Sequence, residues 1–84
     1  MNQNRTGTVY AIVSNLLMVE INIPVINREI CYILLPQEQK KLMAEVIKVQ
    51  SGRCYVQVYE NTRGVRVGDS VEFTGELLEV DLAP

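Results

Sequence analysis

Few side chains in this sequence could do covalent chemistry, and their types and spacing argue against it. Cys31 and Cys54 lie too far apart for a C-x-x-C pair, and the chain contains no histidine. A Ser-His-Asp triad is therefore impossible, and a four-ligand zinc site cannot be assembled. The glycines do not form the G-x-x-x-x-G-K-[ST] loop that holds a phosphate. We expect no catalytic, cofactor-binding or metal-ligating residue in this chain.

Carboxylates and tyrosines remain as candidates, for acid–base catalysis and for base stacking. Some of the acidic residues occupy polar positions in segments of alternating hydrophobicity, which predicts a solvated outer face because charged side chains are rarely buried. These are Glu20, Glu45, Glu60, Glu72, Glu79 and Asp81. The four tyrosines lack the basic groove of a single-strand-binding surface. Tyr55 and Tyr59 fall on one outer face, which favours partial burial against a partner.

The overall composition is that of a small globular protein. The 84 residues suffice for a single domain, 1–84, and 48% of them are hydrophobic and 21% charged. A net charge of -2 disfavours a nucleic-acid partner, since phosphate binding needs clustered Lys and Arg. No secretory signal is visible, and the uncharged stretch 6–18 is too short to span a bilayer. These features predict a cytoplasmic protein without direct membrane contact, whose two thiols stay reduced.

Apolar and polar residues alternate with period two along much of the chain, and no segment has the sustained spacing of an amphipathic helix. The first two strands are expected to form a hairpin around Ser14-Asn15. Its inward positions would be Val9, Ala11, Val13, Leu17, Val19 and Ile21. After an interruption at Pro24 and Asn27, the alternation resumes with Ile30, Tyr32 and Leu34.

The second half of the chain predicts further short strands. Residues 35–41 read as an exposed loop, and the strand 42–49 changes phase near Val46-Ile47, which indicates a bulge. The expected turns lie at Ser51-Gly52, Gly64, Gly68-Asp69 and Gly75-Glu76. The expected inward residues are Cys54, Val56, Val58, Val71 and Phe73, followed by Leu78, Val80 and Leu82. Six or seven short strands without a helix predict an all-β fold, a small closed antiparallel barrel, because closure removes exposed strand edges.

The segment 44–82 resembles the amino-terminal β-barrel of rotary ATPase head subunits. Catalytic (A or alpha) subunits of the vacuolar and archaeal type show A-E-V-I, a short Gly turn, V-Q-V-x-E-x-T-x-G, V-G-D-x-V and T-G-x-x-L-x-V-x-L. Here these motifs occupy residues 44–47, 51–52, 56–64, 67–71 and 74–82. The opening G-T-V-Y-A-I-V-S-N-L-L-M-V-E-I is also similar to the first hairpin of the family, and 22–41 is the least similar part.

The resemblance implies that the chain is the amino-terminal barrel of a longer catalytic subunit of a V-type ATP synthase, which couples ATP hydrolysis or synthesis to ion transport across a membrane. The barrel would be a non-enzymatic scaffold in a crown of barrels from the neighbouring A and B subunits. ATP or ADP and Mg would bind in a missing catalytic domain. The head would be cytoplasmic and peripheral to the membrane. The isolated chain is expected to be monomeric or weakly associating and not to bind ATP.

Within this interpretation, the candidates for the lateral subunit contact are charged residues on the loop between the fifth and sixth strands. They are Glu60, Arg63, Arg66 and Asp69. There are three other interpretations of the chain. The B subunit and the type III secretion or flagellar export ATPases carry similar barrels, although E-F-T-G-E-L-L-E-V-D-L favours the catalytic subunit. A free-standing oligonucleotide-binding barrel is disfavoured by the pI of about 5.0. A small-molecule enzyme would lack a base or nucleophile constellation.

Overall fold

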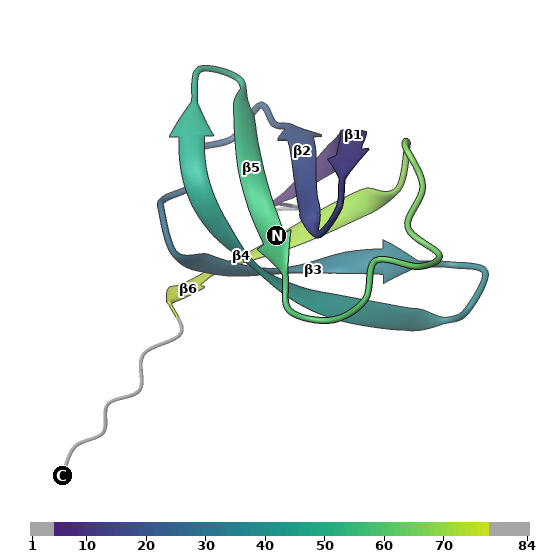
Figure 1. Ribbon diagram of the computed structural model, residues 1–84. Coiled ribbons are helices and arrows are strands. Elements are labelled where there is room, and N and C mark those ends of the chain that lie inside the picture. Colours follow the sequence, from purple (N-terminus) through teal and green to yellow (C-terminus); the bar gives the residue numbers. More distant parts are fainter. Residues whose placement is uncertain (1–4, 78–84) are drawn as a thin grey trace, which may run out of the picture.

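Six antiparallel strands close into a barrel in this computed structural model, which describes residues 5–77 (Figure 1). The strands are β1 (Thr6–Val13), β2 (Leu16–Glu20), β3 (Glu29–Leu35), β4 (Lys40–Gln50), β5 (Arg53–Val58) and β6 (Ser70–Leu77). Their order around the barrel is β1-β2-β5-β4-β3-β6, so β1 returns to pair with β6. The predicted closed antiparallel barrel is confirmed. Leu78, Val80 and Leu82, the expected final inward residues, lie outside the described part of the chain.

The interior of the barrel is filled by aliphatic side chains, two cysteines and one phenylalanine. Alternation predicted the inward faces of β2, β5 and β6 correctly: Leu17, Val56 and Val71 are fully buried and Phe73 is 3% exposed. A filled interior of this kind packs at close to crystal density and deforms little. The barrel is therefore a packed solid and not a pore.

Two strands differ in phase from the expectation. In β1 the register shifts between Val9 and Ala11, so that Ile12 packs against the core while Val13 is 55% exposed. Ala11 and Val13 are thus not inward residues, because an extra residue in one strand of a pair reverses the faces beyond it. The expected bulge in β4 is confirmed, between Val46 and Lys48.

In β3 the core-facing residues are Cys31, Ile33 and Leu35, whereas Tyr32 and Leu34 are half-buried on the other side. Of the positions named from the sequence, Ile30 is buried, at 6% exposed, whereas Tyr32 and Leu34 lie on the face opposite to the core residues. Because the strand is apolar on both faces, the sequence could not decide which face points inward.

Two expected connections also change. Leu35 is 2% exposed and ends β3, so the predicted loop 35–41 shrinks to a turn of residues 36–39 before β4 begins. Gly75-Glu76 is not a turn, since β6 continues to Leu77. The turn at Ser51-Gly52 is as expected, and the φ of +75° at Gly52 explains the glycine there.

At Gly7, the closed barrel leaves no room for a side chain. Gly7 is buried and pairs with Val71 of β6, while its neighbour Thr8 pairs with both Glu20 of β2 and Ser70 of β6. A Cβ added at Gly7 would lie 2.7 Å from the carbonyl oxygen of Glu20. Glycine therefore allows β1 to run between its two neighbours.

We predict that Gly7→Ala destabilises the chain by about 3 kcal/mol, because the new methyl meets backbone and cannot be accommodated by a rotamer change. The matched control is Gly52→Ala, where a Cβ meets nothing within 4 Å and only the positive φ is unfavourable. Its expected cost is about 1 kcal/mol. Urea unfolding followed by far-UV circular dichroism measures both. Equal stabilities of the two variants would contradict the close approach at Gly7.

Candidate functional site

The predicted contact residues all lie on the loop 59–69, which joins β5 to β6 and runs along one side of the barrel (Figure 1). Glu60, Arg63 and Arg66 are exposed, and Asp69 is half-buried at the end of the loop. Among the described residues, no salt bridge engages any of the four side chains. Their role in a subunit contact remains a prediction, but three of the four side chains are free to meet a partner.

The first half of this loop is fastened to the turn between β1 and β2. The side-chain amide of Asn15 donates to the carbonyls of Val58 and Glu60, at 3.3 and 3.4 Å. The hydroxyl of Thr62 donates to the carbonyl of Ser14 at 3.2 Å. These bonds hold the backbone that carries Glu60 against the barrel.

The second half of the loop is fastened to β1 itself. The amide of Gly68 donates to the carbonyl of Val9 at 2.8 Å, and the amide of Val9 donates to the carbonyl of Asp69 at 3.0 Å. The Asp69 carboxylate accepts from the amide of Arg66 at 2.8 Å. Asp69 therefore closes its own turn, a use typical of Asp at such positions. Its carboxylate is less available to a partner than the other three side chains.

An apolar groove that sequence analysis missed lies next to the start of this loop. Its lining consists of Val13, Ser14, Asn15, Leu16, Ile47 and Gln57. Val13 is 55% and Ile47 44% exposed, because the bulges in β1 and β4 turn them outward. In the sequence, the change of phase at Val46-Ile47 indicated that Ile47 faces outward. The bulge in β1, which turns Val13 outward, has no such signal in the sequence.

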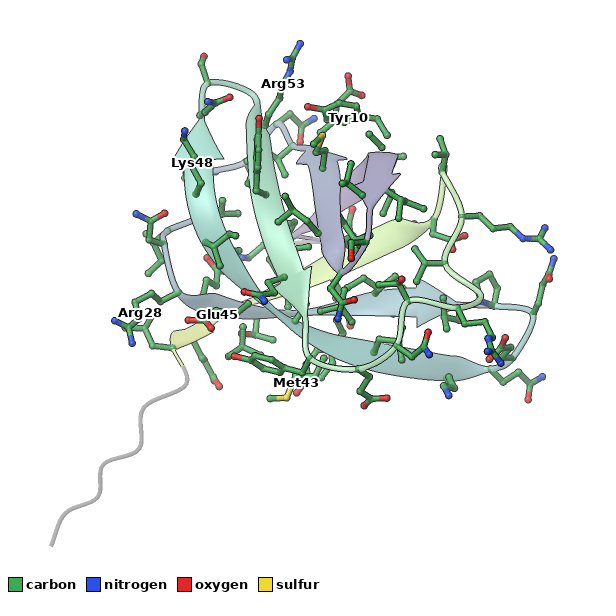
Figure 2. All side chains as sticks on the ribbon, viewed as in Figure 1. Tyr10, Arg28, Met43, Glu45, Lys48 and Arg53 are labelled. Carbon is green, nitrogen blue, oxygen red and sulfur yellow. The ribbon has the colours of Figure 1, made fainter. Side chains whose placement is uncertain are left out.

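A polar cluster lies on the outer face of β4, beyond the end of β5. The Tyr59 hydroxyl donates to the Glu45 carboxylate at 2.9 Å, and the Arg28 guanidinium lies 3.8 Å from the same carboxylate. Figure 2 shows Arg28 and Glu45 next to one another at this edge. Burial and the hydrogen bond to the Glu45 carboxylate raise the pKa of Tyr59. Tyr59 thus keeps its proton, and its hydroxyl donates a hydrogen bond to Glu45.

The other three tyrosine rings are each accompanied by a cation. Lys41 lies 5.6 Å from the ring centre of Tyr32. Lys48 and Arg53 lie at 5.9 and 5.5 Å from the rings of Tyr55 and Tyr10. Tyr10, Lys48 and Arg53 are labelled in Figure 2. Contacts of this kind stabilise the outer surface by roughly 0.5–1 kcal/mol each. The rings are therefore already covered in part and do not form an open platform for bases.

The two thiols are free and buried in the core, as expected of small apolar residues. Burial raises the pKa of Cys54 from its usual 9.0 to about 12, and the charge of Glu29 adds to the effect. Burial also raises the pKa of Cys31, with smaller contributions from Cys54 and Glu29. Both side chains therefore stay protonated near neutral pH and are poor nucleophiles.

Two further observations on residues 5–77 concern ligand binding. A polar depression at one end of the barrel is lined by Thr6, Gly7, Thr8, Glu20, Ile21, Asn22 and Gly52, with a single ionisable group, Glu20. In the described part of the chain, no three acidic, cysteine or histidine side chains gather as metal ligands do. No helix in that part is long and apolar enough to cross a membrane.

Comparison with known proteins places this architecture in a family. The family model for the ATP synthase alpha/beta family, beta-barrel domain, matches residues 9–75. The chain therefore belongs to the ATP synthase alpha/beta family and comprises its barrel domain. This confirms the family inferred from the sequence motifs.

Relatives that the chain matches include alpha chains of V-type ATP synthases. Over 78 residues it is 40% identical to the V-type ATP synthase alpha chain of Borrelia hermsii and 41% identical to that of Treponema denticola. It is 42% identical to V-type ATP synthase alpha chain 1 of Treponema pallidum. Each match covers 93% of this chain and 13% of the relative. The chain thus corresponds to the amino-terminal barrel of a V-type ATP synthase alpha chain.

The raised pKa of Cys54 predicts a loss of stability at alkaline pH. The folded chain favours the neutral thiol, so this contribution is complete below the usual pKa of 9.0 and is lost as the pH rises toward 12. Urea unfolding as a function of pH should show a shallower decline in Cys54→Ala than in the unmodified chain. Val56→Ala, a truncation at another fully buried position of β5, should lower stability without changing this slope. Equal slopes in all three proteins would contradict the prediction.

Proposed function

We propose that this barrel is a scaffold in the head of a rotary V-type ATP synthase, where it holds its own subunit in a ring with neighbouring subunits. The observation that carries the proposal is the match of residues 9–75 to the barrel domain of the ATP synthase alpha/beta family. The relatives are named alpha chains, which favours the catalytic A subunit over the B subunit and the export ATPases.

A scaffold must be stiff and must present a contact surface to a neighbouring subunit. Stiffness follows from the closed strand order and the filled interior, because neither leaves an edge or a void that can yield. The loop 59–69 and the adjoining apolar groove supply a surface with an apolar centre and a charged border. Such a combination is typical of protein contacts. We assign Glu60, Arg63 and Arg66 to this contact, whereas Asp69 shapes the loop.

The chemistry of the parent enzyme would reside outside this chain. ATP or ADP and Mg would bind in a catalytic domain that the chain does not contain, and the coupling to ion transport would be carried out by the whole assembly. Its partners would be the barrels of neighbouring A and B subunits in a cytoplasmic head that is peripheral to the membrane. In this proposal the isolated barrel neither binds nor hydrolyses ATP and associates weakly, since a single small contact stays below the ~1,000 Å² of a stable interface.

The test replaces the barrel of the Treponema denticola alpha chain with residues 1–84 and measures ring assembly with the partner subunits by native mass spectrometry. The chimera should assemble, and deletion of the barrel should abolish assembly. Arg63→Glu combined with Arg66→Glu should weaken assembly on the order of tenfold, because each reversed charge would oppose a partner at the interface.

The matched control combines Lys48→Glu with Arg53→Glu, an equal double charge reversal on exposed residues next to the turn between β4 and β5. It should leave assembly within about twofold of the chimera. Normal assembly of a head without any barrel would refute the scaffold. Equal effects of the loop and control reversals would refute the assignment of the loop alone.

A further inference from the structure

Glu29 is the buried charged residue of the barrel. Its side chain is 1% exposed. Within residues 5–77, Glu29 is the single charged or polar residue that is buried. Its carboxylate accepts three hydrogen bonds: from the Arg5 guanidinium at 2.8 Å, from the amide of Gly75 at 2.7 Å and from the amide of Ile26 at 3.1 Å. A buried carboxylate without such donors would cost several kcal/mol. The position therefore requires all three partners.

The partners of Glu29 belong to three separate parts of the fold. Arg5 precedes β1, Ile26 lies in the connection between β2 and β3, and Gly75 lies in β6. Arg5 is also joined directly to β6, since its carbonyl accepts from the amide of Phe73 at 2.8 Å. Glu29 thus connects β3 to both strands of the β1–β6 pair, which we call the closing seam.

The closing seam is the shortest ladder of the barrel. Its register comprises the pairs Thr6–Glu72, Gly7–Val71 and Thr8–Ser70. By contrast, the β2–β5 ladder runs without a register shift from Leu16–Gln57 to Glu20–Arg53. With few backbone pairs of its own, the closing seam depends more than the other ladders on additional bonds.

The neighbouring β3–β6 ladder is interrupted where Glu29 acts. Between the pairs Glu29–Leu77 and Cys31–Phe73, one residue of β3 faces three residues of β6. Gly75, with a φ of +79°, lies in this bulge, and its amide donates to the Glu29 side chain. The Thr74 hydroxyl bonds the carbonyl of Ile30 at 2.8 Å in the same stretch. Side chains therefore hold β6 where the regular ladder fails.

From this arrangement we infer that Glu29 is a latch for the closing seam. Its carboxylate holds Arg5 and the bulge of β6 onto β3, and loss of its charge opens the β1–β6 pair locally while β2, β5 and β4 stay paired. The Arg5 Nε is buried and makes no hydrogen bond within the described residues, so among them the Glu29 carboxylate is the side-chain partner of this guanidinium. The barrel would therefore open first between β1 and β6, the strand that ends at Leu77.

Hydrogen exchange of single amides, measured by NMR on the 84-residue chain, tests the latch. In Glu29→Gln we expect the amides of Phe73 and Gly75 to lose protection by at least about tenfold, because a neutral amide oxygen is a weaker acceptor than a carboxylate. The new NH2 group also opposes a donor at either oxygen position: the Ile26 amide at one, the Gly75 amide and the Arg5 guanidinium at the other. The Phe73 amide responds through Arg5, whose carbonyl accepts from it. The amides of Val58 and Tyr59 bond to the carbonyls of Asn15 and Met43, away from the seam, and their exchange should change less than about threefold.

The matched control is Glu72→Gln, the same chemical change on β6 at a half-exposed carboxylate that pairs with Lys41 on the outside. It should leave Phe73 and Gly75 protected. If Glu29→Gln fails to fold, Arg5→Lys provides the milder change, because an ammonium keeps the charge but not the guanidinium geometry. Faster exchange of Phe73 and Gly75 alone supports the latch. Equal changes at all four amides would overturn it. No change of exchange in either Glu29→Gln or Arg5→Lys would overturn it as well.

Discussion

Closure of the β1–β6 pair is the constraint on which the rest of this small barrel depends. The first strand must satisfy backbone groups of β2 on one side and β6 on the other, and Gly7 permits the approach because it has no Cβ to meet the carbonyl of Glu20. If β1 did not return to β6, both strands would present unpaired edges. The loop 59–69 depends on the same strand, since Gly68 bonds Val9 and Thr62 bonds Ser14. The barrel and its candidate contact surface are thus fixed by one strand.

The proposed function follows from shape and surface and not from reactive groups. The thiols are neutral in the core, and the tyrosines are capped by cations or bonded to a carboxylate. A packed interior with few voids transmits a load without deforming, which is what a ring of subunits requires of the domain that sets its spacing. The two bulges place Val13 and Ile47 on the outside, beside the charged loop. The irregularities of the barrel are therefore the features that create the proposed contact surface.

Alternation and turn residues predicted most of the fold, and long-range contacts account for the rest. The inward residues of β2, β5 and β6 followed from period two because a charged or polar residue marks the other face of each strand: Glu20, Gln57 and Glu72. Ala11 and Val13 did not, because a bulge at Tyr10 leaves no trace in composition. Gly75 was expected to be a turn residue, but it lies in a bulge of β6 opposite β3, where its φ is positive. Glu29 was missed because its donors, Arg5 and Gly75, are 24 and 46 residues away in the sequence. The four loop residues could be located from turn glycines, but the structural use of Asp69 required the coordinates.

Solution NMR of the 84-residue chain tests closure most directly. Nuclear Overhauser effects between the backbones of Gly7 and Val71, and of Thr8 and Ser70, report the β1–β6 pair, while Met18 with Tyr55 serves as an internal reference on the β2–β5 ladder. A closed barrel predicts the cross-strand signals of both ladders together under native conditions. Signals between Met18 and Tyr55 without those between Gly7 and Val71 would show an open sheet and contradict the account.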